Sequence, residues 1–143
     1  MSYEYIRGLI EGEGCFTFCT IGYQGSEKLR IPAFILSMSK RDEELINSVK
    51  HRLKIRNKIY ENKERIRKDS YNRQPMITMI IRDIGQLKNI IVPLCYKKFY
   101  GNKGIQFEKW MEEIGSNPSV PKGYKFIYKL YKDGYYDRIH DFD

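Results

Sequence analysis

The fold of this chain is decided by residues 6–14, which read IRGLIEGEG. Gly8 and Gly12 lie four residues apart and therefore on one face of a helix, where the absence of side chains lets another backbone approach closely. A glycine inside a helix costs about 1 kcal/mol relative to alanine, so two of them require a packing reason. Glu11 and Glu13 come at the C-terminal end of this helix, where the helix dipole disfavours acids, and a cation is expected nearby.

Hydrophobic spacing extends this helix backwards and predicts the elements that follow it. Ser2 is placed to cap the helix at its start, and Gly14 is expected to end it in the left-handed conformation that glycine adopts without strain. Beyond Gly14 the pattern changes to period two and later returns to helical spacing. We expect helices at 2–12, 39–53, 83–95 and 104–114. The first strand would run from residue 15 to a turn at 22–26, and three further strands would lie at 29–37, 58–67 and 73–82.

Four strands in two hairpins predict an α+β fold with an αββαββα core. Its four-stranded antiparallel sheet would be twisted into a saddle, with the helices on one face. Residues 1–115 would form this core domain, and residues 116–143 a basic, tyrosine-rich extension that packs on it. Within the extension, Asp133-Gly134 between alternating residues indicates a hairpin, but helical spacing fits the same stretch almost as well.

The charge of the chain indicates a polyanionic partner. The formal net charge is +8 and the chain contains twelve tyrosines, a combination typical of proteins that bind nucleic acid. Residues 50–73 hold ten lysines and arginines against three acids, so the positive charge is concentrated. We therefore expect the helix-free face of the sheet to be lined with Arg and Lys and to lie on double-stranded DNA, because strands fit the major groove.

Composition excludes several other classes of protein. The chain has no run of about 18 apolar residues, and its N-terminus lacks the pattern of a signal peptide. We expect no membrane partner and an intracellular protein, cytoplasmic in a prokaryote or organellar. Three cysteines without C-x-x-C spacing and only two histidines argue against a zinc site and favour reduced, structural thiols.

Residues 6–14 resemble the signature of the LAGLIDADG homing endonucleases, with Glu in place of the more usual Asp at both acidic positions. The resemblance implies that this helix packs against its twin in a second copy of the chain through Gly8 and Gly12. It also implies that Glu13 binds divalent metal at the DNA being cut, that the backbone carbonyl of Gly12 shares this metal, and that Glu11 is structural. Oxygen ligands favour hard cations, so the expected cofactor is Mg²⁺ or another divalent ion such as Mn²⁺.

The resemblance further implies a lysine near the active site, in a segment after the last core helix. Lys103 matches this pattern best, and Lys98 is the competitor. A departure from the family occurs at the end of the second strand, where a glutamine often positions water. Met38 stands at that position here and cannot hydrogen-bond water usefully, so Ser39 or Lys40 could take its place.

Nine side chains on the predicted strands or near their ends are expected to contact DNA. Arginines would pair with guanine and lysines would mostly touch phosphates. The nine are Lys28, Arg30, Lys40, Lys58, Tyr60, Arg65, Arg67, Arg73 and Thr78.

These features predict a homodimeric, metal-dependent endodeoxyribonuclease that cuts both strands of a long pseudo-palindromic site. By resemblance it would be encoded in a mobile intron. Two alternatives use the same scaffold, namely an RNA maturase that assists intron splicing and a DNA-binding regulator without catalysis. The presence of Glu13 together with Lys103 favours the endonuclease over both.

Overall fold

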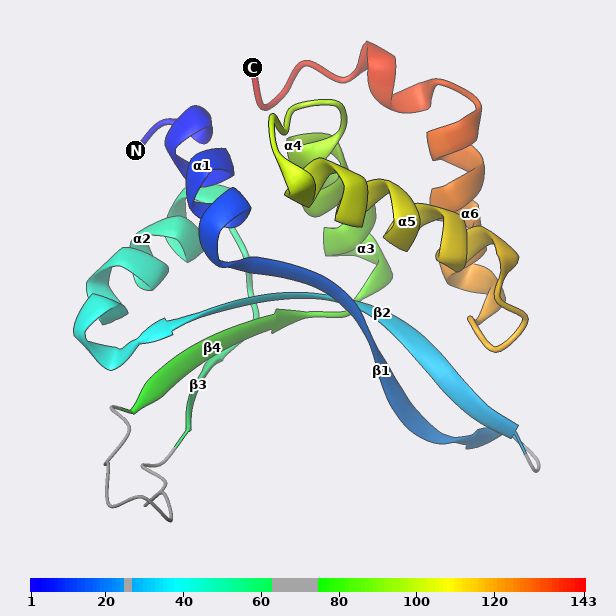
Figure 1. Ribbon diagram of the computed structural model, residues 1–143, viewed down its shortest axis with the longest axis horizontal. Helices are drawn as coiled ribbons and strands as arrows, with labels where there is room; N and C mark the ends of the chain where they lie inside the picture. The colour runs from blue at the N-terminus through cyan, green and yellow to red at the C-terminus, as the bar shows by residue number, and fades with distance from the viewer. Residues whose placement is uncertain (25–26, 63–74) are drawn as a thin grey trace.

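The computed structural model describes residues 1–24, 27–62 and 75–143 of the chain. Four strands make one antiparallel sheet in the order β1-β2-β4-β3, and the helices gather on one of its faces (Figure 1). The predicted α+β fold is therefore confirmed. The strands are β1 (Gly14–Gln24), β2 (Glu27–Ser39), β3 (Ile59–Asn62) and β4 (Met76–Ile81). The longer helices are α1 (Tyr3–Glu13), α2 (Glu43–Leu53), α5 (Asn102–Ser116) and α6 (Lys122–Lys132), and 3₁₀ turns occur at Lys40–Asp42 and Tyr135–Arg138.

The helix-covered face of the sheet carries the hydrophobic core. Phe16 of β1 lies opposite Phe34 of β2, and Phe34 lies opposite Ile81 of β4. The centroid of the Phe16 ring is 5.2 Å from the rings of both Phe107 and Trp110, which belong to α5. Since side chains alternate along a strand, the intervening residues project to the opposite face, which no helix of the described part covers (Figure 1).

Gly14 joins α1 directly to β1. Its φ of −79° and ψ of 158° are extended, so the prediction of a left-handed end to this helix is wrong. Glycine is required here for space instead, because a Cβ would lie 2.8 Å from Cγ2 of Ile10 and 2.9 Å from its carbonyl oxygen. The chain passes from helix into strand without a turn, which places Glu13 where the helix meets the sheet.

The helix predicted over 83–95 contains one wide turn. It consists of α3 (Ile84–Gln86), a π-helical turn (Leu87–Ile91) and α4 (Val92–Cys95). Pro93 lies in the first turn of α4, and since proline has no N–H, a wide turn before it accommodates the missing hydrogen bond. Leu87, Ile91 and Leu94 are all fully buried, so the interruption leaves the apolar stripe facing the core.

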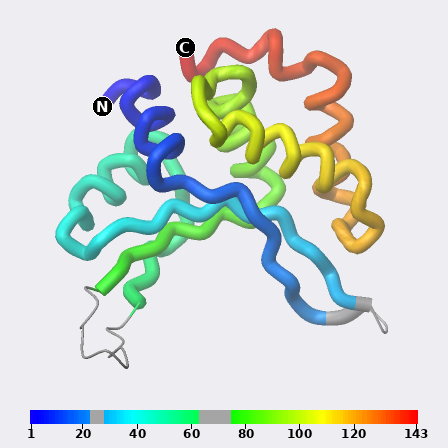
Figure 2. Tube along the Cα trace, in the orientation of Figure 1, coloured from blue at the N-terminus to red at the C-terminus, as the bar shows by residue number. Residues whose placement is uncertain are grey.

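The C-terminal stretch that fitted both a hairpin and a helix is helical. It forms α6, after which Gly134 takes a φ of 79° and the chain reverses. The final residues return to α1 (Figure 2), where the ring centroids of Phe142 and Tyr3 lie 5.2 Å apart.

Lys125 of α6 caps the C-terminal end of α5. Its Nζ donates to the carbonyl oxygens of Ile114 at 3.0 Å, Gly115 at 3.3 Å and Asn117 at 2.8 Å. Because a cation at a helix C-terminus satisfies free carbonyls and opposes the dipole, we expect Lys125→Met to lower the free energy of unfolding by about 1–2 kcal/mol. Urea denaturation measures this difference. Lys129→Met, at an exposed lysine of the same helix, is the control, and equal stability of the two variants would contradict the capping role.

No helix in the described part combines the length and the apolar character needed to cross a bilayer. All three cysteines are free, and burial raises the pKa of the Cys95 thiol. A buried thiol of raised pKa is unreactive, so Cys95 is a packing residue.

Candidate active site and nucleic-acid interface

Glu13 is the last residue of α1, and its carboxylate is exposed. The described residues offer it no hydrogen-bond or ion-pair partner. Gly12, which precedes it, is exposed as well, so its backbone carbonyl lies beside an open surface. Two hard oxygen donors therefore stand together at the end of the motif helix, as a site for a hard divalent cation requires.

Lys103, in the first turn of α5, lies beside this end of α1. Its Nζ donates to the carbonyl oxygen of Gly14 at 2.5 Å and to Oε1 of Gln106 at 3.1 Å. A cation from another helix therefore lies at the C-terminal end of α1, the end that carries the two acids. Gln106 was not predicted, and only the spacing of three residues from Lys103 on a helix could have indicated it.

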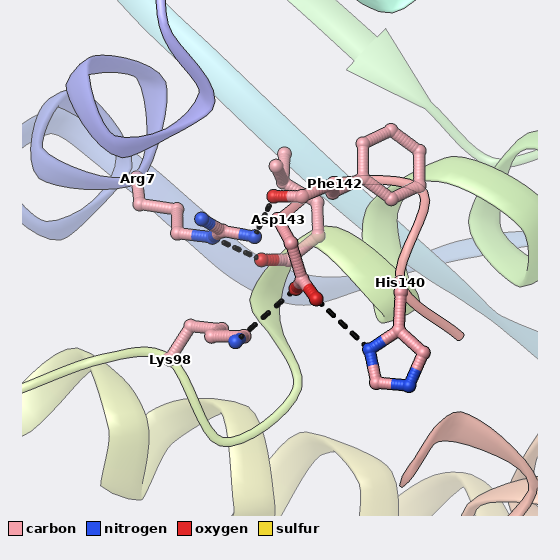
Figure 3. Close-up of polar contacts among 6 residues, drawn as sticks. Arg7, Lys98, His140, Phe142 and Asp143 are labelled. Atoms are coloured by element: carbon pink, nitrogen blue, oxygen red, sulfur yellow. Dashed lines mark hydrogen bonds and ion pairs between the residues drawn. The ribbon is translucent and has the colours of Figure 1, made fainter. Parts of the chain in front are cut away.

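Lys98 lies in a different set of contacts, shown in Figure 3. Its Nζ is 3.4 Å from Oδ1 of Asp143, whose Oδ2 is 2.9 Å from Nδ1 of His140. The hydrogen bond from His140 and the charge of Lys98 lower the pKa of the Asp143 carboxyl. Beside them, the buried Arg7 donates from Nε to the carbonyl oxygen of Leu94 at 2.8 Å. Lys98 thus helps to hold the C-terminal segment, whereas Lys103 contacts the carbonyl oxygen of Gly14, the residue after Glu13.

The glycines of α1 border open space. Both Gly8 and Gly12 are exposed, and a Cβ built on either would meet nothing within 4 Å. Tyr5, one turn before Gly8, is also 52% exposed. No contact within the described chain therefore requires a glycine at either position.

The helix-free face of the sheet is less charged at its centre than expected. Ser37, Thr78 and Tyr60 are cross-strand neighbours there, with Ser37 Oγ 2.7 Å from Thr78 Oγ1. By the same alternation, Cys15, Thr17, Cys19, Ile35 and Ile80 share this face. In the described part the centre of the face is thus hydroxylic and apolar, which corrects the prediction of a surface lined throughout with Arg and Lys.

The residues predicted to contact DNA have different surroundings. Lys28, Lys58 and Tyr60 are exposed, whereas Thr78 is buried. Lys40 is exposed and pairs with Glu61, its Nζ lying 2.9 Å from Oε1 of the glutamate. Arg65, Arg67 and Arg73 lie outside the described residues.

Arg30 lies on the face opposite to the one expected. Its Nη2 is 3.1 Å from Oε2 of Glu113 in α5, and its guanidinium lies 4.9 Å from the centroid of the Phe18 ring. The prediction placed Arg30 on the DNA face, but the alternation that turns Phe34 into the core turns Arg30 the same way.

Met38 also projects into the core, where it is 5% exposed and lies opposite Ile77. Ser39 accepts a hydrogen bond from the backbone N–H of Arg41 and begins a 3₁₀ turn. The two serines that flank Met38 alternate with it, so it is Ser37 and Ser39 that project to the helix-free face.

A divalent cation would find few protein ligands in one copy of this chain. Among residues 1–24, 27–62 and 75–143, no three His, Cys, Asp or Glu side chains come together. Glu13 and the Gly12 carbonyl fit a Mg²⁺-type ion in chemistry, but they do not complete a coordination shell. A complete shell would need oxygen ligands beyond those that the described residues of one copy bring together here.

A family model for LAGLIDADG endonucleases matches residues 6–114. The chain belongs to this family. No curated protein has a significantly similar sequence. The LAGLIDADG match begins within α1 and ends within α5, so it includes the whole sheet and the candidate site residues Glu13 and Lys103.

Solved structures of LAGLIDADG homing endonucleases share the fold. The chain is 19% identical to I-LtrWI bound to target DNA, covering 93% of this chain and 44% of that one, with a TM-score of 0.62. For I-SmaMI bound to cleaved DNA the identity is 18%, the coverages are 93% and 43%, and the TM-score is 0.66. For the homing endonuclease I-TnaI the identity is 18%, the alignment covers 93% of this chain and 87% of that one, and the TM-score is 0.64. The LAGLIDADG chain described here thus spans less than half of the first two proteins and most of I-TnaI.

Proposed function

We propose that two copies of this chain form a site-specific DNA endonuclease that requires a divalent metal. The observation that carries the proposal is the exposed carboxylate of Glu13, which has no partner among the described residues, at the end of a helix whose glycine face is open. A second motif helix packed on Gly8 and Gly12 about a twofold axis would bring two copies of Glu13 together. The repulsion between the two carboxylates creates a site for cations between them.

Glu13 and the Gly12 carbonyl would hold Mg²⁺ or Mn²⁺, with the phosphates of the DNA as further oxygen ligands. When bound, such an ion supplies charge neutralisation at the phosphate and acidifies a water. Lys103 would hold positive charge beside this point and stabilise the charge that develops on the phosphate. In this proposal Gly12 shares the metal ion with Glu13, and Lys103 adds positive charge near the phosphate.

The sheet would read the DNA half-site. β1 contains 11 residues and a strand rises about 3.3 Å per residue, so β1 has a contour of about 36 Å, about ten base pairs. Two copies would read a roughly palindromic site of about twice that length. Tyr60 and Lys58 are exposed beside the helix-free face and are the candidates for base and phosphate contacts in the described part.

Cleavage of a plasmid library that carries randomised 24-base-pair inserts tests the proposal. With Mg²⁺ or Mn²⁺ present, we expect linear products whose sequenced ends define one pseudo-palindromic site, and with EDTA we expect none. If the protein enriches a DNA site by binding but leaves it uncut with either metal, the endonuclease proposal fails and a binding regulator replaces it. Selective binding of structured RNA alone would instead support a maturase.

The choice between the two lysines can be tested on the cleaved site. We expect Lys103→Met to slow single-turnover cleavage about 10²-fold, because the cation beside the acid is lost. Lys98→Met is the matched control and should cleave within about twofold of wild type, since an exposed ion pair such as Lys98–Asp143 contributes little. The reverse order of effects would assign the catalytic role to Lys98.

A further inference from the structure

Glu11 connects the motif helix to the start of α5. Its Oε1 accepts from the backbone N–H of Tyr100 at 2.7 Å, and its Oε2 accepts from the backbone N–H of Gly101 at 3.2 Å. Gly101 is the N-cap residue of α5 and has no side chain with which to cap the helix. A carboxylate is favourable at a helix N-terminus, so Glu11 places a negative charge from α1 at the start of α5, where it accepts the N–H groups of Gly101 and of Tyr100 before it.

The connection is reciprocal. Lys103 in the first turn of α5 donates to the carbonyl oxygen of Gly14, just beyond the end of α1. The N-terminus of α5 thus receives an anion from α1, and the C-terminus of α1 receives a cation from α5, which is the favourable sense at both helix ends. We call this arrangement, formed by Glu11, Tyr100, Gly101, Lys103 and Gly14, the α1–α5 clasp.

From this geometry we infer that Glu11 is a positioning residue that holds Lys103 at the C-terminal end of α1, the end that carries Glu13, through the α1–α5 clasp. The inference rests on the proposed function of Glu13 and Lys103. The carboxylate of Glu11 is held at the start of α5 by the N–H groups of Tyr100 and Gly101, which leaves the metal role to Glu13. Glu11 is also two residues from Glu13, about 200° around the helix, and so points in another direction.

The α1–α5 clasp gives a physical role to each acid of the motif. Glu13 remains exposed for the metal, and Glu11 connects two helices whose bonded residues lie 89 and 90 positions apart in the sequence. Lys103 is only two residues beyond Gly101, so a shift of Gly101 displaces the lysine with it. A displacement of about 1 Å in a catalytic group can reduce a rate by about 10²-fold.

A double-mutant cycle on the cleavage rate tests the inference. The variants are Glu11→Gln, Lys103→Met and the double variant, compared by single-turnover cleavage of the selected site at saturating protein. We expect Glu11→Gln to slow cleavage about 10- to 10²-fold with DNA affinity unchanged, because an amide can accept only one of the two N–H bonds. The double variant should cleave no more slowly than Lys103→Met alone, because Glu11 acts through that lysine.

A purely structural Glu11 would give a different result. The rate losses of Glu11→Gln and Lys103→Met would then multiply in the double variant, and that outcome overturns the inference. Cleavage by Glu11→Gln at the wild-type rate overturns it as well. Glu108→Gln is the control, because Glu108 is an exposed acid of α5 outside the α1–α5 clasp, and it should cleave as wild type does.

Hydrogen exchange tests the α1–α5 clasp independently of cleavage. We expect the backbone amides of residues 100–104 to exchange at least about tenfold faster in Glu11→Gln than in wild type, and at the wild-type rate in Glu108→Gln. Unchanged exchange in Glu11→Gln overturns the inference even if cleavage falls. If wild type binds its site but never cuts it, the proposed function fails, and faster exchange would still show that Glu11 orders the start of α5.

Discussion

Replacing Glu13 by glutamine should abolish cleavage and leave DNA binding intact. The amide has the shape of the carboxylate but no charge, so it does not hold, in competition with water, the divalent cation that would neutralise the phosphate. Loss of metal-ion catalysis costs several kcal/mol of transition-state stabilisation, and 4 kcal/mol corresponds to about a 10³-fold slower reaction. We therefore expect at least this loss in single-turnover cleavage of Glu13→Gln.

The affinity for DNA separates this prediction from a folding defect. Glu13 is exposed and has no partner among the described residues, so Glu13→Gln should keep the stability of wild type and bind the selected site with an affinity within about threefold. Glu108→Gln removes an exposed acid elsewhere and should cleave normally. Rapid cutting by Glu13→Gln in Mg²⁺ would remove the acid from the active site and contradict the proposed function.

The elements that could be predicted from sequence are those with a strong local pattern. The glycines, the acids and the change from helical to alternating spacing near Gly14 are sufficient for α1 and β1, and the four-stranded sheet follows from two hairpins. The conformation of Gly14 could not be predicted in this way. Position 14 requires glycine because Ile10, one turn earlier, occupies the space that a Cβ would need. That contact depends on the direction in which the strand leaves the helix, which local sequence does not specify.

Face assignments failed where a strand carries charge near its end. The sequence predicts Arg30 on the DNA face as an arginine that could pair with guanine. In β2, however, Arg30 is an even number of residues from Phe34 and so projects to the same face as that core residue. Glu113, 83 residues further along the chain, provides the partner that makes this orientation favourable. Such a partner cannot be inferred from strand periodicity alone, because it depends on how α5 crosses the sheet.

The choice between Lys98 and Lys103 is also a matter of tertiary structure. Lys98 lies in the connection before α5 and Lys103 in the first turn of that helix, and in the sequence only the family resemblance favours Lys103. The separation comes from residues distant in sequence, since Asp143 holds Lys98 and the carbonyl of Gly14 receives Lys103. The role inferred for Glu11 has the same origin, because its two N–H partners lie 89 and 90 residues away.

Gly8→Leu should stabilise the single chain and yet remove its activity. A Cβ at Gly8 meets nothing within 4 Å, and leucine favours a helix over glycine by about 0.8 kcal/mol, so the free energy of unfolding of the monomer should rise by up to that amount. The same side chain would stand between two motif helices that pack glycine to glycine. We expect sedimentation at micromolar concentration to show monomer, and cleavage to fall below detection, because the proposed active site requires both copies of Glu13.

The opposite signs of these two effects make Gly8→Leu a sharp test of the dimer. Gly85→Leu is the matched control, since Gly85 is also an exposed helical glycine, and a Cβ there meets its nearest atom, Oδ2 of Asp83, at an ordinary 3.9 Å. It should change neither the oligomeric state nor the cleavage rate. If Gly8→Leu sediments as a dimer and cuts as wild type does, the open glycine face of α1 is not the interface. A monomer that still cuts both strands would instead show that one Glu13 is sufficient, and the shared central site would have to be abandoned.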